Sequence, residues 1–160
     1  MHWRTLFRTL KQMYKFHSAS VRYSTLHQSK CGVLEIEFGG VLTAQAVLHL
    51  WPLCQLHTRK APALVVRLDR AALVYDDPDI IPIEQVATTP PTAIVVPPAL
   101  YERYKQFACK VSAMGILRAA FLPSQVVFAY QWAEFHCRLA DSPQWLASRQ
   151  RRPESGFAPL

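Results

Sequence analysis

The chain has 160 residues, of which 51% are hydrophobic and 18% are charged. This length and composition are sufficient for one ordinary domain with a hydrophobic core, and they exclude a broadly disordered chain. His, Pro or Arg interrupts the apolar runs within about ten residues, whereas a bilayer-spanning helix needs about 20. We therefore expect no transmembrane helix.

The formal net charge of +7 is concentrated at the two ends of the chain. Residues 1–30 hold six bases and no acid, residues 31–148 hold nine bases and ten acids, and residues 149–160 hold three bases and one acid. Nucleic-acid-binding proteins usually carry clustered bases on the folded body. The charge distribution therefore argues against a nucleic-acid partner.

The four cysteines, Cys31, Cys54, Cys109 and Cys137, form neither a C-x-x-C pair nor a zinc-binding spacing. The first segment has charges scattered through it and lacks the single apolar block of a secretory signal. We therefore expect a cytoplasmic protein with reduced thiols, without a structural disulfide, a metal site or a cofactor.

The segment 3–17, "WRTLFRTLKQMYKFH", places its apolar residues at helical spacing. This pattern predicts a basic amphipathic helix within residues 1–20, with four bases on its polar side: Arg4, Arg8, Lys11 and Lys15. Three roles remain open for it: packing on the domain or a partner, contact with an anionic membrane, or targeting to an organelle.

Residues 21–26 and 33–40 read as two strands of a hairpin. The second strand alternates cleanly, with Glu35 and Glu37 on the face opposite Leu34, Ile36 and Phe38. We expect the two glutamates to lie on a solvated face. A pair of catalytic carboxylates is the alternative.

Residues 42–60 are predicted to form a helix that begins at an N-cap, Thr43, and is kinked or divided at Pro52. His49, Cys54 and His57 fall near one another on the helix surface. Because no fourth ligand follows at a telling spacing, we do not expect them to bind a metal.

The remaining elements alternate between strands and helices. Strands are predicted at 63–68, 93–96 and 116–122, and helices at 99–115 and 124–142. The Pro-rich segment 70–92 between the first two strands is expected to be a loop with at most a short helix. In the last helix the predicted core stripe comprises Val127, Phe128, Ala129, Trp132, Phe135 and Leu139. Residues 143–160 read as a flexible C-terminal tail.

This order predicts an α/β domain over residues 21–142, with a mainly parallel sheet of about five strands, an N-terminal hairpin and helices packed on the sheet. Three segments, "GGVLT", "VVRLDRAALVYDD" and "RAAFLPSQVVFAYQWA", resemble the STAS fold of sulfate transporters and anti-sigma factor antagonists. The first resembles the opening of the family's first helix, the second its central strand and loop, and the third its last strand and helix.

The resemblance implies a non-enzymatic regulatory module that binds a protein partner through the loop at residues 70–82. Antagonists of the family carry a Ser or Thr after the loop Asp, which a partner kinase phosphorylates. Here Asp76 or Asp77 takes the loop position, and Asp77 or Pro78 follows it. We therefore expect a relative without the phosphorylation switch, in which the partner-binding acids Asp76, Asp77 and Asp79 also cap a turn.

Two alternatives to the interaction module remain. A strand that ends in Asp-Asp in an open α/β sheet could hold Mg²⁺ and handle phosphoryl groups, with Asp76 and Asp77 as ligands. The basic N-terminal segment could instead bind an anionic membrane surface or lipid. The sequence identifies neither the partner nor the oligomeric state.

Overall fold

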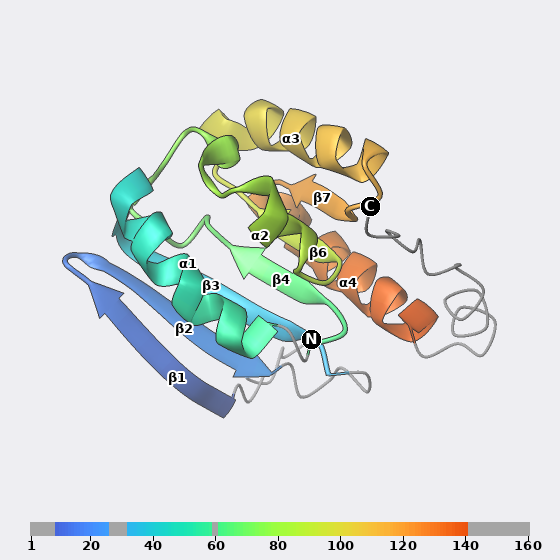
Figure 1. Cartoon of the computed structure of the whole chain (residues 1–160), viewed down its shortest axis with the longest axis horizontal. Helices are drawn as coiled ribbons and strands as arrows, with labels where there is room; N and C mark the ends of the chain where they lie inside the picture. The colour runs from blue at the N-terminus through green and yellow to red at the C-terminus, as the bar shows by residue number, and fades with distance from the viewer. Residues whose placement is uncertain (1–8, 26–31, 59–60, 141–160) are drawn as a thin grey trace, which may run out of the picture.

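The computed structural model describes residues 9–25, 32–58 and 61–140. Within these residues, strands and helices alternate after an N-terminal run of strands (Figure 1). The elements are β1 (Thr9–Phe16), β2 (Ala19–Thr25), β3 (Leu34–Leu42), α1 (Ala44–Thr58), β4 (Leu64–Arg67), β5 (Leu73–Val74), α2 (Ile83–Ala87), β6 (Thr92–Val95), α3 (Tyr101–Ala113), β7 (Arg118–Phe121) and α4 (Val126–Ala140). The α/β class predicted from the sequence is confirmed.

The strands form one mixed, seven-stranded sheet in the order β1-β2-β3-β4-β6-β7, with the two-residue β5 paired to β3. The pairs β1–β2 and β2–β3 are antiparallel, whereas β3–β4, β4–β6 and β6–β7 are parallel. The predicted hairpin between residues 21–26 and 33–40 corresponds to β2 and β3. The prediction of about five strands missed β1 and the short β5.

The predicted N-terminal helix is wrong from Thr9 onward, because residues 9–16 form β1 at the edge of the sheet. Residues 1–8 lie outside the described residues. A bulge between Leu10 and Gln12 shifts the register, so the apolar spacing of this strand departs from strict alternation and imitates a helix. Tyr14 and Phe16 pack against the core beside α1. This segment is therefore part of the domain, and the boundary predicted at residue 20 does not separate it.

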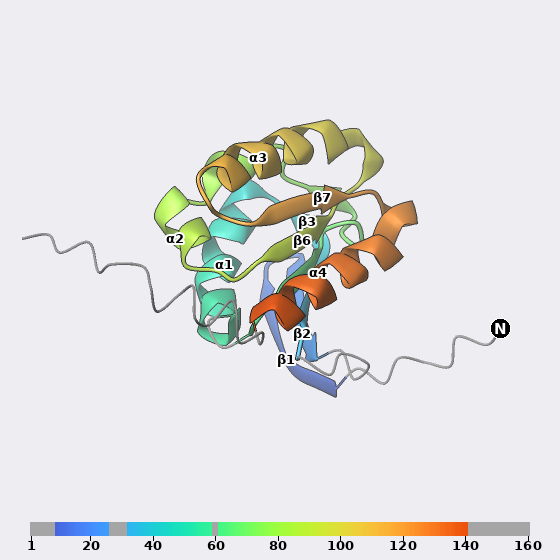
Figure 2. The ribbon, with the colours of Figure 1, turned by 90° about the vertical axis from the view of Figure 1, so that its right-hand side faces the viewer.

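Helices cover both faces of the sheet, and each face has its own core (Figure 2). The larger core lies under α1, α2 and α3, and α4 covers β4, β6 and β7 from the opposite side. Thr43 caps α1 as expected, since its Oγ1 accepts from the backbone N–H of Ala46 at 3.1 Å. Pro52 lies inside α1, which continues through it to Thr58.

The core stripe predicted for α4 is only partly correct, because Ala129 is buried and Trp132 packs against the core, whereas the two phenylalanines are exposed. Phe128 and Phe135 are 60% and 58% exposed. Small side chains form the buried face instead: Ala129, Ala133 and Cys137. They let the helix lie close to the sheet, where they pack with residues such as Val65 and Ala93. Phe128 and Phe135 then remain on the outer side, whereas Tyr130 and Trp132 pack partly against the core.

The segment predicted as a Pro-rich loop with at most a short helix contains a 3-10 turn at Pro78–Ile80 and the five-residue α2. A buried arginine of β7, Arg118, holds its end. The guanidinium donates to the carbonyls of Val86 at 2.7 Å and Pro90 at 3.0 Å, and to the hydroxyl of Thr89. These bonds satisfy backbone acceptors where α2 ends.

Two side chains occupy backbone groups on the outer edge of β7. Leu117 and Phe121 direct their carbonyls to β6, so in this alternating ladder the backbone groups of Arg118, Ala120 and Leu122 point to the open edge. Ser112 Oγ donates to the carbonyl of Arg118 at 3.1 Å and lies 3.4 Å from its N–H. The side chain of Gln125 accepts from the N–H of Leu122 at 3.1 Å. Such capping blunts an edge strand against pairing with another chain.

Candidate functional site

The three acids singled out from the sequence lie together in the turn after β5, which we call the acid turn (Asp76, Asp77 and Asp79). Asp77 performs the predicted capping role: its Oδ1 accepts from the N–H of Asp79 at 2.9 Å, at the start of the 3-10 turn. This geometry is an N-cap that satisfies a backbone donor without help from solvent.

The two other acids of the turn reach across to α3. Asp76 Oδ2 accepts from Arg103 Nη1 at 3.1 Å, and Asp79 Oδ1 accepts from Lys110 Nζ at 2.9 Å. All four side chains are more than half exposed. Between them lies an open hollow of about 450 Å³, whose rim also includes Gln106 and Phe107. The acid turn and α3 thus form one surface of alternating charge.

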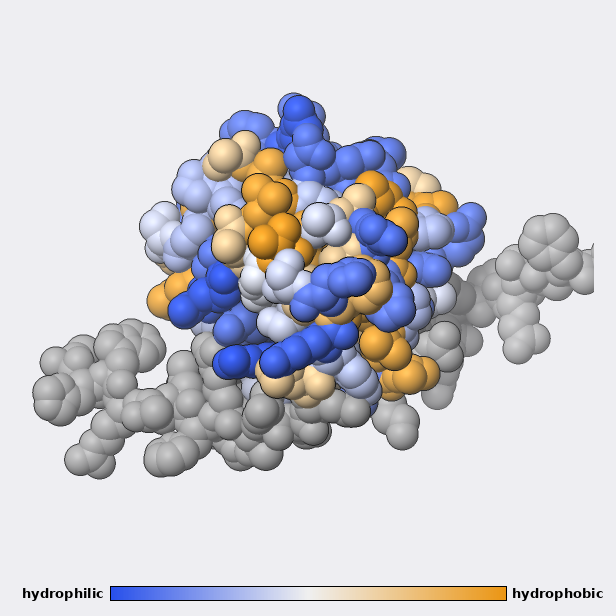
Figure 3. Space-filling model, turned by 90° about the vertical axis from the view of Figure 1, so that its left-hand side faces the viewer, coloured by the Kyte–Doolittle hydropathy of each residue, from blue (hydrophilic) through white to orange (hydrophobic). Residues whose placement is uncertain are grey.

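This surface is near the carboxyl ends of the parallel strands, because the acid turn follows β4 and β5 (Figure 1). Figure 3 views the molecule from the side toward which the arrow of β4 points in Figure 1. Hydrophilic residues cover much of that side, and hydrophobic residues occur between them as separate patches.

The four bases predicted to form a membrane or partner surface do not form a helical face. Arg4 and Arg8 lie outside the described residues. Lys11 and Lys15 belong to β1, where Lys11 falls at the bulge and the side chain of Lys15 is exposed. Successive strand residues alternate between the two faces of a sheet, so the helical spacing of these bases has no counterpart in the structure.

The two histidines and the cysteine singled out in α1 each contact a different aromatic residue. His49 is exposed and stacks on Phe16 with ring centroids 4.2 Å apart. His57 Nε2 lies 3.3 Å from the hydroxyl of Tyr14. Cys54 is fully buried beside Tyr23. Across the described part of the chain, no three His, Cys, Asp or Glu side chains gather in a group that could hold a metal ion.

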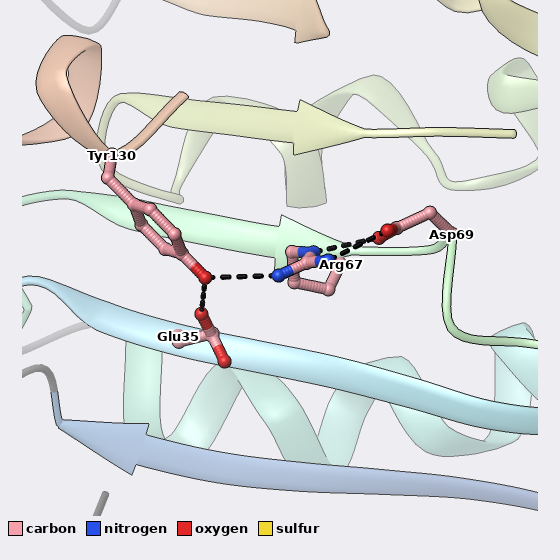
Figure 4. A network of polar contacts seen from close by, with 4 residues as sticks. All are labelled: Glu35, Arg67, Asp69 and Tyr130. Atoms are coloured by element: carbon pink, nitrogen blue, oxygen red, sulfur yellow. Dashed lines mark hydrogen bonds and ion pairs between the residues drawn. The ribbon is translucent and has the colours of Figure 1, made fainter. Parts of the chain in front are cut away.

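A second polar cluster lies beneath α4 and was not expected. Glu35 is fully buried, so the prediction of a solvated strand face was wrong for this residue; Glu37 is half-buried. α4 crosses the sheet on the side to which Glu35 points, and Tyr130 of that helix donates to Glu35 Oε2 (Figure 4). The pattern of β3 specified the two faces correctly but could not show that α4 covers one of them.

The cluster continues from Tyr130 into β4 and the residue after it (Figure 4). Arg67 Nη1 donates to the hydroxyl of Tyr130 at 3.1 Å. The same guanidinium donates to both oxygens of Asp69, from Nε at 2.8 Å and from Nη2 at 2.7 Å. Both side chains of this ion pair are less than one-tenth exposed. A bidentate ion pair of this kind fixes the orientation of the two side chains as well as pairing their charges.

In this buried network (Glu35, Arg67, Asp69 and Tyr130), the surroundings fix the protonation states of Tyr130 and Arg67. Burial, followed by the hydrogen bond and charge of Glu35, raises the pKa of the Tyr130 phenol to about 12. Burial opposes the charge of Arg67, but its hydrogen bonds and charge interactions with Asp69 and Tyr130 together outweigh burial and raise the pKa of the guanidinium. At neutral pH the phenol therefore remains a donor and the guanidinium remains charged.

Two signals in the sequence could have indicated the network. Arg67 interrupts an otherwise apolar strand, "LVVRL", and Asp69 follows two residues later. A charge in a buried strand normally needs a partner of opposite sign. Tyr130 carried no such signal, because its role depends on where α4 crosses the sheet.

Among the described residues, no helix is both long and apolar enough to cross a membrane. Comparison with family models, with curated proteins and with solved structures finds no match for this chain.

Proposed function

We propose that the chain is a non-enzymatic, STAS-like module that binds a protein partner through the acid turn and the adjoining face of α3. The observation that carries the proposal is the pair of exposed ion pairs, Asp76 with Arg103 and Asp79 with Lys110. They place acids and bases side by side at one surface, where a partner with the complementary pattern could meet both.

Because these ion pairs are exposed to solvent, the charges of a bound partner could replace them. A solvent-exposed ion pair contributes only about 0–1 kcal/mol to stability, so a partner's charges could replace the internal ones at little cost. The ion pair of Arg67 with Asp69 differs, since both side chains are buried and separating them would leave unpaired charges. The acid turn is therefore a better candidate contact surface than the buried network.

The STAS-like part of the proposal rests on element order. β3, β4, β6 and β7 lie side by side in sequence order, and the acid turn follows β4, where the family resemblance puts the regulatory loop. Since Asp77 caps the turn and no Ser or Thr lies between Leu64 and Ala87, the module would bind without a phosphorylation switch in this loop. We place it in the cytoplasm, where thiols such as the exposed Cys109 stay reduced.

The geometry gives less support to a Mg²⁺-dependent enzyme. Asp76 accepts a hydrogen bond from Arg103, and one carboxylate oxygen of Asp77 accepts a hydrogen bond from the backbone N–H of Asp79. A cation would have to compete with the positive charge of Arg103. The membrane alternative loses its motivating feature over residues 9–16, which form a strand.

The test compares two variants matched in charge. In the first, Asp76→Asn and Asp79→Asn remove both exposed carboxylates but leave the cap at Asp77. In the second, Glu84→Gln and Glu102→Gln remove two exposed acids from the first turns of α2 and α3. Binding proteins are first captured from the native host with the wild-type chain and identified by mass spectrometry. The affinity of the purified partner is then measured with each variant by calorimetry.

We expect at least tenfold weaker binding for the aspartate variant, about 1.4 kcal/mol, and less than a twofold change for the glutamate variant. Circular dichroism and urea unfolding establish that both variants fold. Equal affinities for the two folded variants would remove the acid turn as the contact surface.

A further inference from the structure

A small cavity lies on the face of the sheet covered by α1, α2 and α3. Its volume is about 50 Å³. Much of its wall is apolar, with Phe38, Val66 and Ile94 on the sheet and Val47 and Phe107 on the helices. Two nitrogen-bearing side chains also line it, Trp51 of α1 and Arg118 of β7.

The indole of Trp51 is a donor without an acceptor. The residue is 8% exposed, and among the described residues nothing accepts a hydrogen bond from its buried Nε1–H. A buried donor left in this state costs about 1–3 kcal/mol, and buried polar groups in folded proteins almost always have a protein or water partner. The cavity is the space in which an acceptor could meet it.

Arg118, which carries a positive charge, lines the same cavity. The residue is 7% exposed, and its four hydrogen-bond acceptors are all neutral: the carbonyls of Val86, Pro90 and Leu117 and the hydroxyl of Thr89. None of the described carboxylates pairs with it. Buried charges are normally matched by an opposite charge, as Arg67 is by Asp69.

We propose that this cavity binds a small organic carboxylate. A carboxylate oxygen accepts the free indole hydrogen of Trp51, the negative charge balances Arg118, and the carbon atoms lie against the apolar wall. Charges attract more strongly in the protein interior than in water, because the effective dielectric constant there is lower. A neutral molecule of the same shape would satisfy the indole but leave the charge of Arg118 unbalanced.

The volume limits the size of the ligand. A water-sized group needs about 10–15 Å³ of such volume, so a cavity of about 50 Å³ accommodates about three to five non-hydrogen atoms, which is a carboxylate and only one or two further carbons. Acetate and propionate are of this size.

The test is a titration of the full chain followed by ¹H–¹⁵N correlation NMR. The chain has four tryptophans, and Trp51→Phe identifies the indole signal of Trp51 by its disappearance. Sodium propionate is the ligand probe, propionamide is the neutral probe of similar shape, and sodium chloride controls for ionic strength. We expect propionate to move the Trp51 signal downfield in a saturable way and to bind at least tenfold more tightly than propionamide.

A Trp51 signal that propionate leaves unchanged would overturn the proposal, and the cavity would then hold only water. Equal binding of the two probes would overturn the assignment to an anion. A response to sodium chloride equal to that to propionate would also contradict it.

Two variants locate the site. Val47→Ile adds one carbon at the cavity wall, and we expect at least fivefold weaker propionate binding. Trp132→Phe changes a tryptophan of α4 on the opposite face of the sheet and should leave the affinity within twofold. Unchanged binding in a folded Val47→Ile variant would place the ligand elsewhere. Because no protein partner is present, these results are independent of the proposed function of the acid turn.

Discussion

Tyr130 of α4 donates a hydrogen bond to Glu35 of β3, although 95 residues separate the two in the sequence. The bond gives a fully buried carboxylate a donor and ties the last helix to the centre of the sheet. Because the same hydroxyl accepts from Arg67, one phenol connects a base and an acid that would otherwise face the interior with fewer partners.

Removing this hydroxyl should destabilise the fold. In Tyr130→Phe, Arg67 loses an acceptor and Glu35 loses a donor, and we expect the free energy of unfolding to fall by about 2 kcal/mol or more. Urea unfolding measures the change. Tyr101→Phe is the control, because that ring contacts Lys105 through its π face, and less than about 0.5 kcal/mol should be lost. Equal losses in the two variants would mean that the network contributes no stability.

The two faces of α4 should respond in opposite ways to substitution. Phe135→Ser changes an exposed side chain, so the free energy of unfolding should change by no more than about 0.5 kcal/mol. Ala133→Leu forces a larger side chain between helix and sheet and should cost about 1–3 kcal/mol. Thermal unfolding of both variants checks this expectation, and a larger loss for Phe135→Ser would restore the buried aromatic stripe expected from the sequence.

Large apolar side chains are a good guide to the buried face of α3 but a poor one to that of α4. In α3 the large residues Tyr104, Phe107 and Val111 recur at helical spacing and are buried, because the helix packs through bulky side chains. α4 packs through small ones, and size is then a poor guide to burial. Alternation likewise predicted β3, but it could not show that α4 covers Glu35. Local pattern specified the long helices and the strands other than β1 and β5, whereas long-range packing determined which polar groups are buried.

At the candidate surface, the local part was again the predictable part. The cap at Asp77 depends on neighbouring residues and was anticipated. The pairing of Asp79 with Lys110 joins residues 31 positions apart and required the orientation of α3. Trp51 and Arg118 meet at a cavity for the same kind of reason, since three helices and the sheet must be placed before that cavity exists.

Two glycines should differ in their tolerance of alanine. Gly40 has φ +72°, and a Cβ there would lie 1.8 Å from the carbonyl oxygen of Ser18, in the turn between β1 and β2. Gly115 has φ +85° but no atom within 4 Å of such a Cβ. We expect Gly115→Ala to cost about 1–2 kcal/mol through backbone conformation alone, and Gly40→Ala to cost more because the hairpin must move. Denaturant titration ranks the two, and the reverse order would contradict the close approach at Gly40.

Stability should fall at alkaline pH. Burial raises the pKa of Tyr75 and Tyr130 to about 12, and it also raises the pKa of Tyr23 and Tyr104. A phenol in the unfolded chain ionises near pH 10. The protonated state of these phenols therefore contributes stability fully below pH about 10, and the contribution is lost as the pH rises toward about 12.

The effect of Arg118 on stability has the opposite sign. Burial lowers its pKa to about 10, so above that pH the folded protein loses this proton and the cost of burying the charge is relieved. One guanidinium against four phenols leaves a net loss of stability. Urea midpoints measured between pH about 8 and about 11.5 test this sign, with tyrosinate absorbance as the second readout. A midpoint that is constant or rises over this range would contradict the burial of these phenols.

The two side chains on the edge of β7 also affect whether a second copy of the domain can add a strand to the sheet at that edge. Ser112 and Gln125 occupy backbone groups that a second chain would need in order to continue the sheet. Pairing of a further strand along β7 is therefore hindered at Arg118 and Leu122. The exposed Phe128 and Phe135 lie on α4, a helix that contacts β7, so this apolar surface accompanies an edge strand on which two backbone positions are already occupied.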